Sequence, residues 1–318
     1  MTEAAALPVT ADDIRAAHAR IAPYVRRTPV WTLPRAFGHD GPVSLKLEFL
    51  QHAGSFKARG AFSNLVGERV PDAGVAAASG GNHGAAVAYA ARELGHAATI
   101  FVPEISPEAK VDVIRRMGAD VRIGGPRYAD ALFSCGVHIA ATGALSVHAY
   151  DSEATIAGQG TVGLEWEEDA QGGLDTVLVA VGGGGLIAGV AAWFENRVKV
   201  VGVEPTGSRA LHAALEAGAP VDVDVHSIAA DSLGARSAGH LVTEIARRVV
   251  DHVALVGDDS IVAAQRLLWR DYRIATEPGG AAALAALTSG TYRPAPGERV
   301  GVLLCGANVD LAKLDEIA

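Results

Sequence analysis

Short apolar runs alternate with longer amphipathic segments along most of this chain. In the first half, the runs that predict strands occupy residues 75–78, 98–102, 121–123 and 145–149. The segments that predict helices between them occupy residues 85–94, 107–117 and 127–141. Apolar strands without alternation, separated by helices, are typical of parallel sheets covered on both faces.

The same rhythm continues after residue 155. The later predicted strands occupy residues 176–181, 198–203, 250–256 and 300–304, and the later predicted helices occupy residues 186–195, 258–274 and 279–288. We therefore predict an α/β protein with two open, mostly parallel twisted sheets flanked by helices. Residues 70–150 are expected to form a small domain, and residues 1–69 with 151–318 a larger one.

Composition and charge narrow the classes of protein. The 318 residues carry a formal net charge of −9, which argues against nucleic acid or an anionic membrane as the main partner. No run approaches the roughly 20 apolar residues of a membrane helix, and the acidic start does not resemble a signal peptide. Both cysteines, Cys135 and Cys305, are expected to be reduced in a cytoplasmic protein.

Three predicted strands are followed by unusual loops. The loops read SGGNHG at 79–84, GGGG at 182–185 and CGAN at 305–308. In open α/β sheets, ligands bind beyond the carboxyl ends of the strands, so these loops are expected to gather into one site.

The glycine loop after the strand at 176–181 predicts a phosphate site. Glycines allow a tight backbone whose amides point at one anion, and the following helix adds its positive end. The loop also fits the dinucleotide pattern G-x-G-x-x-A over 183–188, with Glu204 about twenty residues further on. This loop alone leaves open whether the phosphate belongs to a nicotinamide dinucleotide or to a smaller cofactor.

Lys57 is the candidate nucleophile. It follows Phe56 and a Gly-Ser turn, and a lysine beside an apolar ring loses its proton more easily than a solvated one. A neutral amine forms Schiff bases with aldehydes.

The run Gly54-Ser55-Phe56-Lys57-x-Arg59-Gly60-Ala61 resembles the cofactor-lysine motif of the fold type II, tryptophan-synthase-like, pyridoxal-phosphate enzymes. The resemblance is closest to the serine/threonine dehydratases and serine racemases, and it covers most of the chain. It continues through the three loops and through shorter motifs at 103–110, 156–161 and 203–205.

This resemblance implies a role for each matching residue. Lys57 would hold pyridoxal 5'-phosphate covalently and act as the base at the α-carbon. The other cofactor-binding residues would be Phe56, Asn82, Gly182, Gly183, Gly184, Gly185, Leu186, Glu277 and Cys305. For Glu277 a second interpretation has equal weight, namely that it only precedes the next helix and has no contact with the cofactor. Residues Ser79, Gly80, Gly81, Asn82 and His83 would bind the substrate carboxylate. The resemblance also implies a homodimer.

Two departures bear on the reaction. The racemases carry a serine where this chain has Gly80, and glycine cannot transfer a proton. Cys305 stands where many relatives have Ser or Thr. We therefore predict β-elimination of a 3-hydroxy amino acid to a 2-keto acid and ammonia. The alternatives are a racemase or β-replacement enzyme of the same fold, or a nicotinamide-dependent dehydrogenase.

Several features stay open at this point. Serine, threonine, a hydroxyaspartate and bulkier 3-hydroxy amino acids all fit the motifs, and His148, Tyr150 and 226–236 are candidates for that side of the pocket. Residues 206–212 after Glu204 lack a second acidic residue, which does not favour a metal ion there, although a monovalent cation held by carbonyl oxygens is not ruled out.

Overall fold

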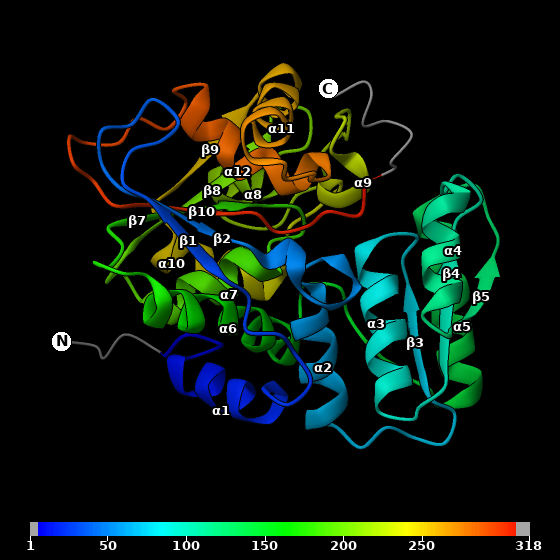
Figure 1. Cartoon of the computed structure of the whole chain (residues 1–318). Helices are drawn as coiled ribbons and strands as arrows, with labels where there is room; N and C mark the ends of the chain where they lie inside the picture. The colour runs from blue at the N-terminus through cyan, green and yellow to red at the C-terminus, as the bar shows by residue number, and fades with distance from the viewer. Residues whose placement is uncertain (1–5, 310–318) are drawn as a thin grey trace.

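The computed structural model describes residues 6–309 and divides their strands between two open sheets (Figure 1). One sheet has the strand order β1-β2-β10-β7-β8-β9 and the other the order β5-β4-β3-β6. Every pairing among the described strands is parallel except that of β1 with β2. The predicted α/β class with mostly parallel sheets is confirmed.

The strands are short and mostly buried. The six-stranded sheet holds β1 (Val30–Leu33), β2 (Val43–Lys46), β7 (Thr176–Ala180), β8 (Lys199–Pro205), β9 (His252–Val256) and β10 (Val300–Leu303). The four-stranded sheet holds β3 (Val75–Ala78), β4 (Ala98–Val102), β5 (Asp120–Ile123) and β6 (Leu145–Ser146).

Helices cover both sheets. Those of the first half are α1 (Ala11–Ile21), η1 (Glu48–Leu50), η2 (His52–Gly54), α2 (Lys57–Gly67), α3 (Asn82–Glu93), α4 (Glu108–Arg116) and α5 (Tyr128–Thr142). Those of the second half are α6 (Glu153–Asp169), α7 (Gly185–Phe194), α8 (Ala210–Ala217), α9 (Ala230–Leu233), α10 (His240–Val249), α11 (Asp258–Tyr272) and α12 (Pro278–Thr288). Figure 1 shows α3, α4 and α5 around the smaller sheet and α2 between the two sheets.

Local sequence explains where several of these elements begin and end. All five residues of β7 are buried, which is why the run shows no alternation. Helix α12 has Pro278 at its first position, where a missing amide hydrogen costs nothing. Helix α5 ends at Gly143, whose φ of 72° is the left-handed conformation that glycine adopts without strain.

Two boundary predictions were wrong. The strand expected over 145–149 ends at Ser146, because the chain leaves the sheet there and the Ala149 carbonyl accepts a hydrogen bond from Lys57 instead of from a neighbouring strand. The helix expected from Ala85 already begins at Asn82, so two of the loop residues predicted for the site belong to its first turn.

Helix α2 packs in the apolar core of the smaller sheet, which is separate from that of the larger sheet. Helix α2 precedes the proposed small domain, yet Ala58, Ala61, Phe62 and Leu65 pack in the same cluster as the interior of β3, α3 and β4. The division into 1–69 with 151–318 and 70–150 remains our proposal. Its boundaries separate the strands of the two sheets but not the side chains packed around α2.

The opposite side of α2 carries Arg59 into a buried ionic cluster. Its guanidinium donates hydrogen bonds to Glu48 at 2.7 Å and 2.9 Å and to Glu165 at 2.7 Å and 2.8 Å. Lys46 completes the cluster with a 3.3 Å contact to Glu165, and all four side chains are at most 1% exposed.

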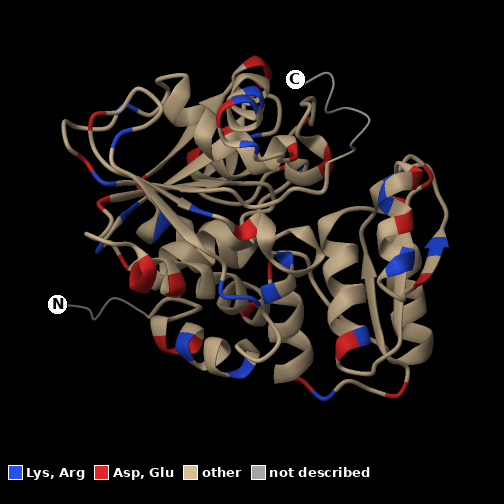
Figure 2. Ribbon diagram, in the orientation of Figure 1, with Lys and Arg blue, Asp and Glu red and all other residues tan. Residues whose placement is uncertain are grey.

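Elsewhere, Figure 2 shows basic and acidic segments interspersed over both parts of the molecule. Among the described residues, no helix has the length and apolar character needed to cross a bilayer.

Removing one charge from this cluster is expected to destabilise the protein. Glu165→Gln leaves the buried Lys46 and Arg59 cations with one carboxylate, and breaking a buried ion pair in this way costs about 3 kcal/mol. Urea unfolding measures the change. The matched control is Glu168→Gln, which removes a 55% exposed partner of Arg27 and should change the free energy of unfolding by less than about 1 kcal/mol. Equal losses in the two variants would contradict the prediction.

Candidate active site

The loop that precedes Lys57 is hydrogen-bonded to the loop that follows β10. The Phe56 amide donates to the Cys305 carbonyl at 3.1 Å, and the Ala307 amide donates to the Gly54 carbonyl at 3.0 Å. Gly54 has a φ of 73°, and a side chain there would meet the Asn308 amide oxygen at 2.4 Å. The Gly-Ser turn is therefore required both by conformation and by space, and it brings Lys57 and Cys305 together.

The Lys57 amine lies in a desolvated position at the start of α2. It donates a hydrogen bond to the Ala149 carbonyl at 2.7 Å and lies 5.1 Å from the centre of the Phe56 ring. Burial lowers the pKa of Lys57 to about 8. A larger fraction of this amine is therefore neutral near pH 8 than in an exposed lysine, as a nucleophile or base requires.

The glycine loop after β7 forms a cradle of backbone. Gly184 has a φ of 90° and precedes α7 without any side-chain cap. Side chains on Gly183 and Gly185 would overlap Tyr150, with contacts of 2.2 Å and 2.6 Å. The amides in the first turn of α7 have no partner within the helix, so this loop can accept an anion.

Asn82 connects two other loops of the site. Its side-chain amide donates to Glu277, and its carbonyl oxygen accepts a 2.7 Å hydrogen bond from Asn308. The second carboxylate oxygen of the buried Glu277 has no hydrogen-bond partner within residues 6–309. Burial raises the pKa of Glu277 to about 7, although the Lys110 charge and the Asn82 hydrogen bond oppose this shift. Glu277 also lies against Gly306, where a side chain would meet its oxygen at 2.2 Å.

The predicted substrate loop lies at the end of β3. The Ser79 amide donates to the Phe101 carbonyl at 3.0 Å, and the Gly81 amide donates to the Ser79 hydroxyl at 3.2 Å. His83 is buried with its Nε2 atom 2.9 Å from the Val147 carbonyl. Burial and the nearby Lys57 lower the pKa of His83 to about 3, so its ring is neutral and held by the backbone.

Cys305 lies in the same interior. It is 4% exposed, and its thiol donates a 3.4 Å hydrogen bond to the Gly279 carbonyl. Burial, and then the nearby Glu277, raise the pKa of this thiol. It is therefore a neutral group, unlike the carboxylates that pair with a protonated ring nitrogen in other cofactor sites.

A cavity of about 430 Å³ opens beside these residues. Asn82, Glu277 and Asn308 line it, together with Lys110 of α4 and Asp231 of α9. The last two form a 3.0 Å ion pair that joins the helices on either side of the cavity. The ion pair was not predicted, because Lys110 and Asp231 are far apart in the chain, although Lys110 ends the motif at 103–110 and Asp231 lies in the candidate segment 226–236.

Two other residues considered from the sequence have different contacts from those expected. Tyr150 packs against the glycine loop at 182–185, whereas the sequence suggested only that it lines the substrate-binding part of the pocket. Glu204 binds no other side chain of the described residues; its carboxylate accepts the Leu211 and His212 amides at 2.9 Å and 2.8 Å and so caps α8. No group of three or more potential metal ligands occurs in the described part of the chain.

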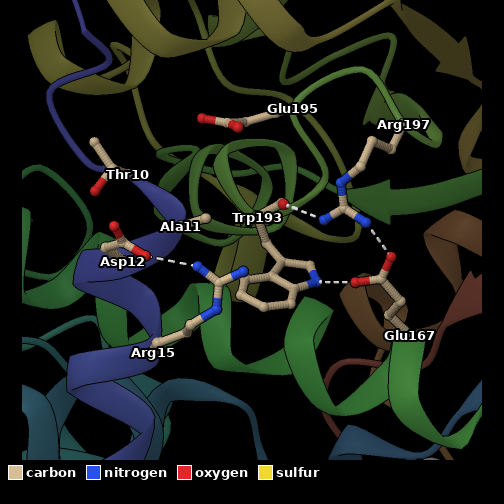
Figure 3. Close-up of a pocket in the computed structure, with 8 residues that line it drawn as sticks. All are labelled: Thr10, Ala11, Asp12, Arg15, Glu167, Trp193, Glu195 and Arg197. Carbon is tan, nitrogen blue, oxygen red and sulfur yellow. Dashed lines mark hydrogen bonds and ion pairs between the residues drawn. The ribbon is translucent and has the colours of Figure 1, made fainter.

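Figure 3 shows a different pocket, of about 350 Å³, whose lining includes none of the predicted site residues. Trp193 lies there between Arg15 and Arg197, 5.0 Å and 5.8 Å from the two guanidinium carbons. Asp12 pairs with Arg15, and Glu167 accepts hydrogen bonds from Arg197 and the Trp193 ring. These partners satisfy one another, so the arrangement is explained as surface packing.

Known proteins resemble the whole of this chain. Residues 21–306 match the family model described as "Pyridoxal-phosphate dependent enzyme". A phenylserine dehydratase of Ralstonia pickettii is 41% identical over 92% of this chain and 91% of its own. An L-threonine ammonia-lyase of Thermotoga maritima is 34% identical over 97% of this chain and 78% of its own. The structure of maize serine racemase superposes with a TM-score of 0.90 at 34% identity, covering 97% of this chain and 96% of that one.

Pyridoxal phosphate fits the residues that the site assembles. The glycine loop and the first turn of α7 would hold the phosphate. The Lys57 amine would bond to the aldehyde, with Phe56 beside it, while Cys305 and Asn82 would contact the ring. The unpartnered oxygen of Glu277 marks a polar position that a bound group would satisfy. These individual roles remain predictions.

Glu277 gives the site an expected pH dependence. Its pKa is about 7 in the folded protein and near 4.5 when unfolded, so its contribution to the free energy of unfolding falls as pH rises from about 4.5 through 7. In the cofactor-free protein, Glu277→Gln should reduce this slope by up to about 1.4 kcal/mol per pH unit, measured by urea unfolding at pH 5, 6 and 7. The exposed Glu244→Gln is the control and should leave the slope unchanged. An unaltered slope in both variants would show that Glu277 is ionised throughout.

Proposed function

Because this chain belongs to the family of pyridoxal-phosphate-dependent enzymes, we propose that it is a dehydratase of a 3-hydroxy amino acid, releasing a 2-keto acid and ammonia. The observation that carries this proposal is that the site contains a desolvated Lys57 amine and has glycine at position 80. The site has one evident base, while residue 80 offers no side chain for a second proton transfer. Elimination needs one base at the α-carbon, whereas racemisation needs a group on each face.

The chain's own residues supply positioning and proton transfer in this reaction. Bound pyridoxal phosphate withdraws electrons from the α-carbon of the amino acid. The Lys57 amine would act as the base that takes the α-proton of the amino acid. The loop 79–83 holds the carboxylate through its amides and the Ser79 hydroxyl. The neutral His83 stays hydrogen-bonded to the Val147 carbonyl and fixes this loop against the residue that follows β6.

Three alternative reactions have unequal support. Relatives named serine racemase, such as that of Arabidopsis thaliana at 35% identity, keep a racemase in consideration. A β-replacement enzyme would share the same proton abstraction and would differ only in accepting a second substrate. The nicotinamide-dependent dehydrogenase loses its support, because the matched family uses pyridoxal phosphate and the glycine loop serves that cofactor equally well.

The substrate within this class is expected to be a serine, a threonine or a bulkier relative of these. A panel of L-serine, L-threonine, 3-hydroxyaspartate and 3-phenylserine, assayed for keto-acid release, separates the possibilities.

We further propose a cytoplasmic homodimer, on the resemblance alone, and analytical ultracentrifugation of the loaded enzyme tests the oligomeric state.

Replacement of Lys57 is expected to abolish the activity. The wild-type protein with pyridoxal phosphate should be yellow, and borohydride should remove its visible band. Lys57→Ala should lack the covalently held cofactor and release keto acid at least about 1000-fold more slowly, because it loses both the attachment and the base. Lys199→Ala, at a partly exposed lysine outside the site, is the control and should behave as wild type. A wild-type protein that stays colourless with added cofactor would refute this reading.

Racemisation is expected to be slow. With L-serine as substrate, D-serine should appear about 100-fold more slowly than pyruvate, because residue 80 provides no acid on the second face of the α-carbon. Chiral chromatography measures the D-serine and a coupled assay the pyruvate. Equal rates of formation would favour the racemase alternative.

A further inference from the structure

The space beside Gly80 is filled by another residue's hydroxyl. A Cβ atom built on Gly80 would lie 2.1 Å from the Ser106 Oγ atom and 2.9 Å from the Ser106 Cβ atom. Real Cβ atoms do not approach other heavy atoms this closely. A side chain at position 80 and the present position of Ser106 therefore exclude each other.

Conformation does not explain this glycine. Gly80 is absent from the glycines with positive φ, which include Gly54 and Gly184 elsewhere in the site. Its φ therefore lies outside the left-handed region that favours glycine, and the close approach of Ser106 is the observed reason for glycine here. The nearest neighbour is the polar side chain of Ser106, from the loop after β4, and the apolar Val102 Cγ1 atom is further away at 3.2 Å.

Two adjacent parallel strands bring Ser106 to this place. β3 and β4 are paired, and the Ser79 amide extends their pairing by donating to the Phe101 carbonyl at 3.0 Å. After β4, a turn closes with the Ser106 amide donating to the Pro103 carbonyl at 3.0 Å. Pro107 then precedes α4, so Ser106 is held between a turn and a helix start.

The Ser106 hydroxyl is free to act on a ligand. It is half-buried, and within residues 6–309 it has no hydrogen-bond partner. A hydroxyl donates readily to a carboxylate, and hydrogen bonds to charged groups are stronger than those between neutral groups.

We propose that Ser106 is a substrate-binding residue that donates its hydroxyl to the carboxylate of the amino acid, and that Gly80 is glycine in order to admit it. Ser106 thereby adds a second hydroxyl to the loop that contains Ser79, from a different strand end. This inference rests on the proposed function, because it assigns Ser106 to the same amino-acid site.

A kinetic experiment tests the contact. Ser106→Ala removes only the hydroxyl and is expected to raise KM for the preferred 3-hydroxy amino acid about tenfold, as loss of a hydrogen bond to a charged group does. The affinity for pyridoxal phosphate and the visible absorption band should not change. Ser134→Ala, on the exposed side of α5, is the control and should keep the wild-type KM. A wild-type KM in Ser106→Ala would overturn the contact.

Thermal unfolding of the cofactor-free protein tests the shared space independently of activity. Gly80→Ala should lower Tm by about 5 °C through overpacking. Adding Ser106→Gly should recover at least half of that loss, while adding Ser106→Ala should recover less, because the Ser106 Cβ atom remains 2.9 Å from the new methyl group. Additive losses, or failure of both double variants to fold, would overturn the steric pairing.

The two measurements separate this inference from the proposed function. If wild-type protein releases no keto acid from any amino acid in the panel, the proposed function fails, and the assignment of Ser106 to the carboxylate fails with it. If keto acid is released but KM does not respond to Ser106→Ala, only the contact fails.

Discussion

The buried ionic cluster around Arg59 fixes the helix that carries Lys57. Arg59 lies two residues after the lysine and donates to two carboxylates, one just before the loop of Lys57 and one on α6. Burial alone would favour the neutral form of Glu165, but hydrogen bonds from Arg59 and the charges of Arg59 and Lys46 lower its pKa overall. Four matched charges therefore hold four elements, β2, η1, α2 and α6, in one arrangement, and the position of the nucleophile follows from it.

The sheet of the second half could be predicted because its strands are continuous apolar runs. β7 and β10 are buried along their whole length and were recognised from local sequence alone. β2 was missed, although it pairs with β10, because it is short and ends in Lys46. That charge is buried only because Glu165, far along the chain, reaches it, and local sequence carries no sign of such a partner.

The active site likewise contains residues that local sequence predicts and residues that only the folded structure reveals. Lys57 and the glycines at 182–185 stand in local motifs whose chemistry is visible from the sequence. The ring of Tyr150 against Gly183 and the hydroxyl of Ser106 against Gly80 depend on which strand ends meet after folding. Glycine at position 80 suggested a site without a hydroxyl at that place. In the folded chain the Ser106 hydroxyl, from the loop after the next strand, takes that space, and we propose that it binds the substrate carboxylate.

Helix α2 also affects how the protein unfolds. One of its faces carries Arg59 into the ionic cluster of the larger sheet, and the other places Phe62 and Leu65 in the core of the smaller one. Neither sheet can lose its packing without exposing a face of this helix. We therefore expect loss of either sheet to disturb the helix that the other sheet also packs against. Because Lys57 is the first residue of that helix, no partly unfolded form with one sheet released retains the site intact.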